Sequence, residues 1–161
     1  MKAVLGILGT LLILAAGYFG MYRGWRNRQS RQADLAPLPA VPEDKTRGTE
    51  GVYVATTTAG DWMDRIAVHE LGVRSIADLA VSADGLIFHR QGAADVFIPA
   101  DKVTGVRTDR GIAGKVTAEK SGLVVVTWTH DGRELDTGFR PRRKADTAAL
   151  TASISTLIGA L

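Results

Sequence analysis

The feature that most constrains this chain is a run of 20 residues without a charged side chain, Ala3–Tyr22. A helix of about 20 residues rises about 30 Å, which is the hydrocarbon thickness of a lipid bilayer. The run therefore predicts a transmembrane anchor over residues 1–22. Everything that follows it is expected to be tethered to a membrane.

A cleaved signal peptide is the alternative to an uncleaved anchor, because both place an apolar run near the N-terminus. The small residues Ala15, Ala16 and Gly17 are the best candidates for a cleavage site. Two features favour the uncleaved anchor: the run exceeds the ~7–15 residues typical of a signal peptide, and four arginines follow it. These arginines are Arg23, Arg26, Arg28 and Arg31.

The charges on either side of the run predict its orientation. Lysine and arginine near a membrane span favour the cytoplasmic side, and the four arginines face only Lys2 on the other flank. We therefore expect a single-pass protein of the plasma membrane, with its N-terminus outside and its C-terminal domain in the cytoplasm. The four arginines would act as a juxtamembrane anchor that meets anionic lipid headgroups.

Residues 23–50 are predicted to form a basic juxtamembrane segment followed by a proline-rich linker. Pro37, Pro39 and Pro42 fall close together among small and polar residues, a composition typical of extended, partly stiff linkers. We expect this linker to hold the following domain off the bilayer without packing. Residues 51–161 then remain for one small domain with its own core.

The charge distribution argues against a nucleic-acid-binding domain. The net charge is +3, but the residues after Glu50 carry equal numbers of basic and acidic side chains. A nucleic-acid-binding module would carry its positive charge on the folded domain, so no nucleic-acid partner is expected. The chain has no cysteine, which excludes disulfides and thiolate metal sites and suits a cytoplasmic domain.

From Gly51 the pattern changes to short strands separated by turns. Runs rich in β-branched and aromatic residues recur about every ten residues, with turns at Asp84-Gly85, Gln91-Gly92 and Asp131-Gly132. Residues 59–72 are expected to form a loop or a short helix with Asp61 as its N-cap. The expected strands cover residues 51–58, 75–82, 86–90, 95–100, 103–109, 122–128 and 133–139. Strands at this spacing predict an antiparallel meander that closes as a barrel or sandwich.

The last segment predicts an amphipathic helix that follows the strand ending at Pro141. From Asp146 onward, apolar residues recur at i, i+4, i+7, i+8 and i+11 and form one stripe. This stripe comprises Leu150, Ile154, Leu157, Ile158 and Leu161. Asp146 or Thr147 is expected to cap the helix. The predicted fold class is α+β, mainly β: an N-terminal transmembrane helix, a linker, and a seven-stranded antiparallel barrel or sandwich capped by a C-terminal amphipathic helix.

The whole chain resembles the actinobacterial single-pass membrane proteins that carry a bacterial pleckstrin-homology (PH)-like domain. The stretches that carry the resemblance are the N-terminal anchor, Gly51-Val-Tyr-Val, Gly60-Asp-Trp-Met-Asp-Arg65, His69-Glu-Leu-Gly72, Phe97-Ile-Pro99, Ala113-Gly-Lys115, Thr127-Trp128 and Thr137-Gly138. The resemblance implies a PH-like fold, in which the C-terminal helix plugs one open end of the barrel, and a membrane location. It implies neither an enzymatic activity nor a known ligand.

Two groups of basic residues are candidates for contact with anionic lipid. The segment Gly111–Lys115 departs from the Walker A pattern, so it is interpreted as a glycine-rich connection or as a basic loop with lysines and arginines around it. These are Arg107, Arg110, Lys115 and Lys120. The second group is Arg140, Arg142, Arg143 and Lys144, which lies just before the C-terminal helix. It forms either a solvated face or a lipid contact. Eukaryotic relatives of the PH fold often bind phosphoinositide headgroups with such side chains.

No catalytic, cofactor-binding or metal-binding constellation is expected. His69, His89 and His130 lack metal-ligand spacing, and the acidic residues around Trp62 are interpreted as capping and ion-pairing groups. Trp62 and Trp128 are expected to pack in the core or at the barrel end. An exposed Trp62 would instead indicate a partner site.

These observations favour a non-enzymatic, membrane-anchored interaction module. Its leading partner is a protein, and an accessory role in a membrane or transport complex is included in that class. The alternative is a module for anionic lipid headgroups at the inner membrane surface. Its contact set would be Lys115, Arg142, Arg143 and Lys144.

Overall fold

The computed structural model describes residues 2–43, 48–109, 111–112, 115–116 and 122–160. The chain divides into two compact units, Met1–Asp34 and Leu35–Leu161. The first unit is dominated by the helix α1 (Lys2–Gln32). The second unit contains the strands and the C-terminal helix.

The helix α1 is longer than its apolar run, because it continues through the arginine-rich stretch to Gln32. The part that meets the length and composition of a membrane span is Gly6–Gly24, and none of that window is buried. Large apolar side chains such as Leu12 and Met21 are about three-quarters exposed, at 73% and 75%. One apolar helix of this kind near the N-terminus fits a membrane span or a signal sequence.

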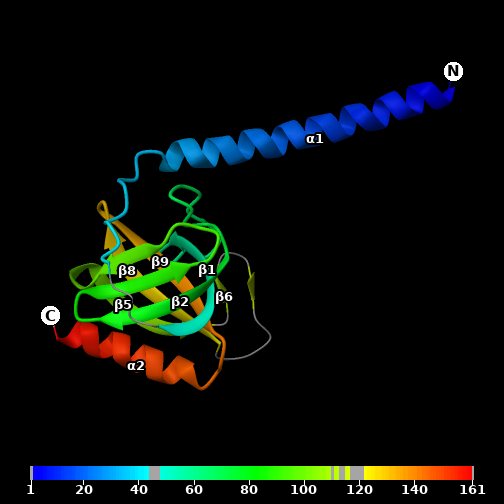
Figure 1. Ribbon diagram of the computed structural model, residues 1–161. Helices are drawn as coiled ribbons and strands as arrows, with labels where there is room; N and C mark the ends of the chain where they lie inside the picture. Colours follow the sequence, from blue (N-terminus) through cyan, green and yellow to red (C-terminus); the bar gives the residue numbers. More distant parts are fainter. Residues whose placement is uncertain (1, 44–47, 110, 113–114, 117–121, 161) are drawn as a thin grey trace. The chain divides into compact units, whose positions relative to one another are not determined.

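The second unit is built on a seven-stranded antiparallel sheet in the order β4-β3-β2-β1-β9-β8-β5 (Figure 1). The strands are β1 (Thr49–Thr58), β2 (Ser75–Ser82), β3 (Gly85–Arg90), β4 (Val96–Pro99), β5 (Val103–Asp109), β8 (Leu123–His130) and β9 (Arg133–Pro141). The two edge strands β4 and β5 are consecutive and are joined by the 3-10 turn η1 (Ala100–Lys102), so the sheet folds back on itself. Two short strands, β6 (Gly111–Ile112) and β7 (Lys115–Val116), form a separate pair.

The predicted strands and turns are confirmed, and the turn chemistry explains why. The β8–β9 hairpin turns at Asp131 and Gly132, which have φ angles of 50° and 71°. Positive φ at both central residues is what a tight hairpin turn requires, and Asp-Gly is a favoured pair for it. Pro141 is the last residue of β9, as predicted.

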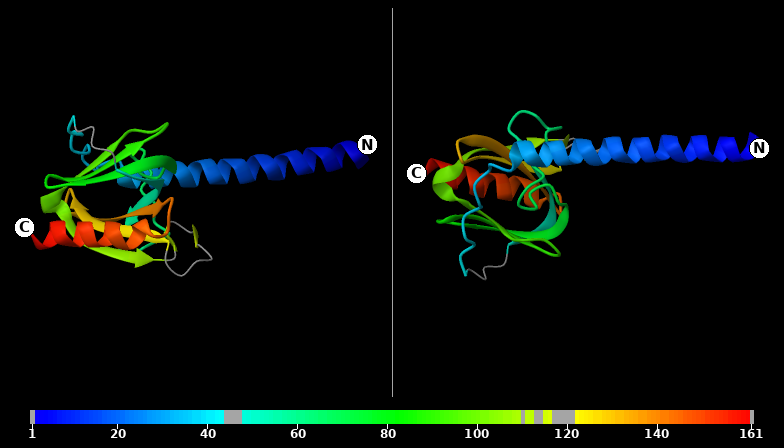
Figure 2. Two further views of the ribbon diagram at one scale, coloured as in Figure 1. Left: turned by 60° about the horizontal axis from the view of Figure 1, so that its bottom comes forward. Right: turned by 90° about the horizontal axis from the view of Figure 1, so that it is seen from above.

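The core lies inside the curved sheet and is closed by the helix α2 (Asp146–Gly159). Tyr53, Phe88, Trp128 and Phe139 are fully buried there, and the ring of Phe88 lies 5.5 Å from that of Tyr53 and 5.9 Å from that of Phe139. The apolar stripe of α2 packs against this core through buried Leu150 and Ile154 and partly buried Leu157 and Ile158. Figure 2 shows α2, in red, along one side of the sheet. Leu161 lies outside the described residues.

A chain of hydroxyl groups crosses this apolar core. The Tyr53 hydroxyl lies 2.6 Å from Thr56 Oγ1, which lies 2.7 Å from Thr137 Oγ1, which accepts the Trp128 indole N–H at 2.9 Å. The Tyr53 hydroxyl also donates to the Leu71 carbonyl at 3.0 Å. Burial raises the pKa of Tyr53 to about 12, against a smaller lowering by the Thr56 hydrogen bond and by Arg90. The tyrosine therefore stays protonated and can keep donating.

The prediction that the linker does not pack is wrong for residues 35–41, which we call the strap. Leu35 is 3% exposed and belongs to the main core, and Val41 packs against a second cluster of Ala80, Ile87 and Phe97. The strap backbone is also hydrogen-bonded. The Leu35 carbonyl lies 2.9 Å from His69 Nε2, and the Ala36 carbonyl lies 2.9 Å from His130 Nε2. Composition does not predict these contacts, because the packing depends on two single apolar residues, Leu35 before the prolines and Val41 among them.

The predicted cap of the C-terminal helix is also wrong. The N-cap residue is Ala145, and no side chain caps the helix. Asp146 instead lies in the first turn and accepts a hydrogen bond from Arg143 Nε at 3.0 Å. Thr147 is buried, and its hydroxyl has no hydrogen-bond partner among the described residues.

Candidate functional site

The exposed basic residues gather where β9 ends and α2 begins. We call Arg140, Arg142, Arg143 and Lys144 the basic corner; all four are exposed. The corner is fixed to the sheet because the Arg142 N–H donates to the Glu50 carbonyl at 2.8 Å. Glu50 is the second residue of β1, so β1, β9 and α2 meet at this point.

Half of the basic corner is paired with acidic side chains. Arg142 Nη1 lies 3.1 Å from Glu50 Oε2, and Arg143 Nε lies 3.0 Å from Asp146 Oδ2. Both guanidinium groups are about 80% exposed, at 78% and 81%, and exposed pairs contribute little stability. Within the described residues no ion pair is formed by Arg140 or Lys144. The corner thus combines two loosely held arginines with two cations, Arg140 and Lys144, that pair with no described residue.

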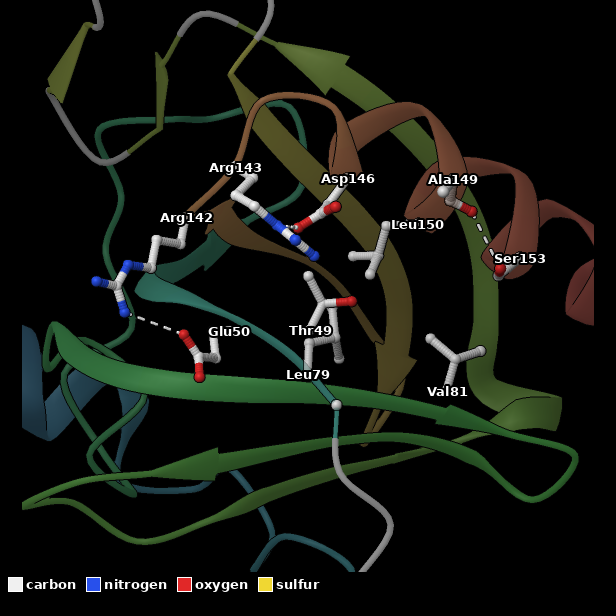
Figure 3. A pocket seen from close by; sticks show the side chains of 11 residues that line it. Thr49, Glu50, Leu79, Val81, Arg142, Arg143, Asp146, Ala149, Leu150 and Ser153 are labelled. Carbon is white, nitrogen blue, oxygen red and sulfur yellow. Dashed lines mark hydrogen bonds and ion pairs between the residues drawn. The ribbon is translucent and has the colours of Figure 1, made fainter.

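A recess lies between α2 and the strands β1 and β2; we call it the helix groove (Figure 3). Its volume is about 690 Å³. Polar and charged side chains form most of its lining, with hydroxyl groups from Thr49 and Ser153. Leu79, Val81 and Leu150 lie at its base, where Leu79 and Leu150 are buried. Figure 3 shows Arg142 and Arg143 at one end of the groove, with Glu50 and Asp146 beside them.

Two further recesses meet the helix groove at Arg142. One, of about 600 Å³, lies on the outer face of the sheet over Val52 and Ile76. The other, of about 440 Å³, is lined by Gly122, Pro141 and three members of the basic corner, Arg140, Arg142 and Lys144. Arg142 lines all three recesses. A ligand that follows this surface meets cations at its centre and apolar side chains on both sides.

The side chains of this arrangement are suited to contacts with anions. Guanidinium groups donate charge-assisted hydrogen bonds to carboxylates and phosphates. Within the described part of the chain, no cluster of three His, Asp or Glu side chains is arranged to hold a metal ion. The histidines have other partners: His69 and His130 contact strap carbonyls, and His89 Nδ1 lies 3.1 Å from Asp95 Oδ2.

The second exposed feature is the tip of the β1–β2 connection, residues 59–74, which we call the tryptophan loop. It contains no helix, and Asp61 Oδ1 accepts the N–H groups of Met63 and Asp64 at 3.1 and 3.3 Å. Trp62 is 49% exposed and Met63 is 65% exposed. The prediction that Trp62 packs in the core is therefore wrong, whereas Trp128 is fully buried as predicted.

One end of the tryptophan loop is held by a buried carboxylate. Asp136 is 3% exposed and accepts two hydrogen bonds from Arg107, at 3.1 and 2.8 Å, and one from Thr127 at 2.7 Å. Its Oδ2 also accepts the Gly60 N–H at 3.2 Å. Burial raises the pKa of Asp136, but these hydrogen bonds and the charge of Arg107 outweigh burial, so that the pKa is lowered overall. The carboxylate is therefore charged at neutral pH.

The other end of the loop is held by a buried arginine. Arg90 is 7% exposed, and its Nη2 donates to the Glu70 and Val73 carbonyls at 3.0 and 2.6 Å. Its Nε donates to Ser75 Oγ at 3.0 Å, and its guanidinium carbon lies 4.2 Å from the centre of the Tyr53 ring. The exposed tip is thus displayed on a loop that is fixed at both ends.

The structure places the predicted contact residues in two separate regions of the domain. Arg142, Arg143 and Lys144 lie together at the start of β1, whereas Trp62 follows the end of β1. Arg107, expected in a basic loop, is instead paired with Asp136. Lys115 lies in β7, but its side chain, like Arg110 and Lys120, lies outside the described residues. The four juxtamembrane arginines lie in the last part of α1, where Arg23 and Arg26 are exposed.

The residues that shape the helix groove carry no functional signal in the sequence. The pattern marks Leu79 and Val81 only as strand residues, and Glu50 only as the last residue of a linker. No local signal places Glu50 beside Arg142, because the contact joins residues 92 positions apart. The cation cluster itself was visible because its members are adjacent in the sequence.

Comparison with known proteins yields one family. The family model described as bacterial PH domain-like matches residues 32–155. The match begins before the strap and ends within α2, so it spans the sheet and most of the C-terminal helix. None of the curated proteins matches the chain.

Proposed function

Since the chain belongs to the bacterial PH domain-like family, we propose that it is a membrane-anchored interaction module that binds a protein partner at the basic corner. PH-like domains are generally non-catalytic interaction modules, and this supports a binding role. The apolar helix α1 supports the anchor. The anchor, the cytoplasmic placement of the domain and the single-pass topology are parts of the proposal.

The observation that carries the proposal is the convergence of three recesses on Arg142. Their linings share the cations of the basic corner and also include carboxylates, such as Glu50, and apolar side chains, such as Ile76. A polypeptide segment with a carboxylate next to an apolar side chain complements this lining, because the carboxylate meets a guanidinium while the apolar group enters the groove. We therefore assign the partner an acidic and apolar binding segment.

An anionic lipid headgroup is the second candidate. The recess that favours it is the one of about 440 Å³, because Arg140, Arg142 and Lys144 line it together. One fact weighs for the protein partner instead. The helix groove beside Arg142 and Arg143 is an extended recess that also contains Leu79, Val81 and Leu150, side chains that a headgroup alone would not use.

Photocrosslinking in intact cells tests the protein partner. A photoreactive amino acid replaces Ser153, which lines the helix groove and is exposed. We expect a discrete protein adduct that is lost when R142E and R143E are added. The matched control adds R74E and K102E, which reverse two exposed charges elsewhere, and it retains the adduct. An adduct that is indifferent to R142E and R143E, or no adduct, contradicts the proposal.

Flotation on vesicles tests the lipid candidate. The unit from Leu35 onward is mixed with vesicles that contain or lack anionic lipid. Lipid binding predicts salt-sensitive flotation on anionic vesicles only, and its loss when Lys115, Arg142, Arg143 and Lys144 are replaced by glutamate. Flotation that survives these four replacements, or its absence, rules out headgroup binding at the basic corner.

A further inference from the structure

We propose that copies of this chain associate head to tail, with the Trp62–Met63 tip of one molecule seated in the helix groove of the next. This inference rests on the proposed function, because it identifies the protein partner of the groove as a second copy of the chain. Its occupant and its groove are both present in one sequence: an exposed apolar tip that carries carboxylates, and a recess that opens beside exposed cations.

The tip and the groove of one molecule lie at opposite ends of the same strand. Arg142 is hydrogen-bonded to Glu50 at the start of β1, whereas the Ala59 N–H donates to the Glu134 carbonyl just past its end. A strand of ten residues rises about 33 Å, and the tip is fixed by Asp136 and Arg90. The tip therefore reaches the groove of a neighbouring molecule and not its own.

The apolar parts of the two surfaces match. Trp62 and Met63 are 49% and 65% exposed, and tryptophan is the side chain most enriched among residues that dominate protein interfaces. The helix groove offers about 690 Å³, within the range of ~300–1,000 Å³ for ligand recesses. Its lining is mostly polar, with Leu79, Val81 and Leu150 at its base. Seating the tip there removes two exposed apolar side chains from water.

Opposite charges flank the tip and the groove. The tip carries the carboxylates of Asp61 and Asp64, and Glu134 lies beside it; none of the three forms an ion pair among the described residues. The groove itself is lined by two arginines and the two carboxylates that pair with them. The positive charge beside it comes from Arg140 and Lys144, which line a neighbouring recess. Opposite charges on mating surfaces steer association and fix its register.

The geometry of this contact is heterologous rather than twofold. A growing oligomer always has one free tip at one end and one free groove at the other. Association therefore continues until a ring closes or until no free molecules remain. A contact made by one loop tip is smaller than the ~1,200–2,000 Å² of a stable interface, so it is weak in dilute solution. Anchoring to one membrane raises the effective concentration of the copies.

Pairwise disulfide formation tests the proposal, because the chain contains no cysteine. Full-length M63C and S153C are reconstituted in the same vesicles and oxidised. We expect the 63–153 disulfide to form several-fold faster than 63–63 or 153–153. The control combines S153C with A83C, which is exposed in the β2–β3 turn. The 83–153 disulfide is expected to form slowly. Faster 63–63 formation, or a 63–153 rate equal to the control, overturns the proposal.

Complementary variants provide the second test. W62A with M63A removes the tip but keeps the groove, and R142E with R143E disables the groove but keeps the tip. All four residues are exposed, so both variants are expected to fold. Each alone should stay monomeric in crosslinking, whereas their mixture should give a dimer and no longer species. Longer species in the mixture, or dimers of either variant alone, contradict head-to-tail assembly.

The two proposals fail in different ways. If Ser153 crosslinks a protein other than this chain while the 63–153 disulfide forms at the control rate, the groove binds a partner and self-association is wrong. If the photoreactive residue at position 153 captures nothing, the proposed function and the inference both fail.

Discussion

At the scale of single residues, Asp136 is the side chain on which the display of the tryptophan loop depends. It joins three strands and the loop through Arg107, Thr127 and Gly60. The carboxylate is 3% exposed, and a buried charge left without its partners is costly. Its contribution should therefore appear both in stability and in the dependence of stability on pH.

We predict that D136N lowers the free energy of unfolding by about 1–3 kcal/mol, because charge-assisted hydrogen bonds to a buried group are lost. The pKa of Asp136 is lowered in the folded protein, so its stabilising effect is complete above pH 3.8, the ordinary value. That effect disappears as the pH falls through the lower folded pKa. Denaturant unfolding of the wild type and D136N between pH 7 and pH 2 measures the difference.

The control for this prediction is E134Q, which removes an exposed carboxylate two positions away on the same strand. We expect it to stay within about 0.5 kcal/mol of the wild type. A difference between wild type and D136N that grows toward low pH would contradict the assignment of Asp136 as the charged member of the network.

The sequence pattern predicts correctly that Trp128 is buried, but it does not predict that Trp62 is exposed, and the reason is physical. Trp128 follows a run of β-branched residues in β8, and burial of that strand carries it into the core. Trp62 stands between Asp61 and Met63 in a loop whose folding depends on Asp136 and Arg90. Both of those anchors are distant in the sequence, so no local pattern reveals that the tryptophan is displayed.

At the scale of elements, periodicity was sufficient for the strands and for α2. Alternation, Asp-Gly turns and the stripe containing Leu150 and Ile154 are local signals, and each one is used in the structure as predicted. The strap was not predictable in the same way. Its role depends on Leu35 reaching a core that other segments build, which is a long-range contact without a local signature.

We predict that L35A in the full chain destabilises the second unit by about 2–5 kcal/mol, because a buried leucine side chain leaves a cavity. A40S, which changes an exposed residue of the same strap, should have an effect within about 0.5 kcal/mol. Near-ultraviolet circular dichroism during denaturant unfolding in detergent measures both variants. Equal stability of L35A and A40S would show that the strap is a passive linker.

At the scale of the whole molecule, the apolar helix and the PH-like unit are separate compact parts of one chain. The arginines at positions 23, 26, 28 and 31 follow the apolar run, and such an asymmetry favours a cytoplasmic C-terminal flank. The sequence carries this information because topology depends on the charge of short segments. The identity of a binding partner depends on surface shape, which only the folded structure provides.

We predict that a C-terminal green-fluorescent fusion is fluorescent in the membrane fraction and that a C-terminal alkaline phosphatase fusion is inactive. Replacing the four arginines with serine, with lysines added before Ala3, should raise phosphatase activity. Mass spectrometry of the purified chain provides the control, because cleavage after Ala15, Ala16 or Gly17 would remove the apolar run. An active phosphatase on the unmodified chain would reverse the topology.

The tryptophan loop is fastened at its two ends by different chemistry. At one end, the Asp136 carboxylate accepts the Gly60 N–H, and this carboxylate loses its charge on protonation. At the other end, the Arg90 guanidinium donates to the backbone carbonyls of Glu70 and Val73, and acid changes the charge of neither group. Strong acid therefore frees the Gly60 end while the other end holds. The middle of the loop is held independently, because the Ile66 N–H donates to the Thr56 carbonyl and the Ile66 side chain is buried in the core. Acid would therefore loosen only the short tip that carries Trp62, before the sheet itself unfolds.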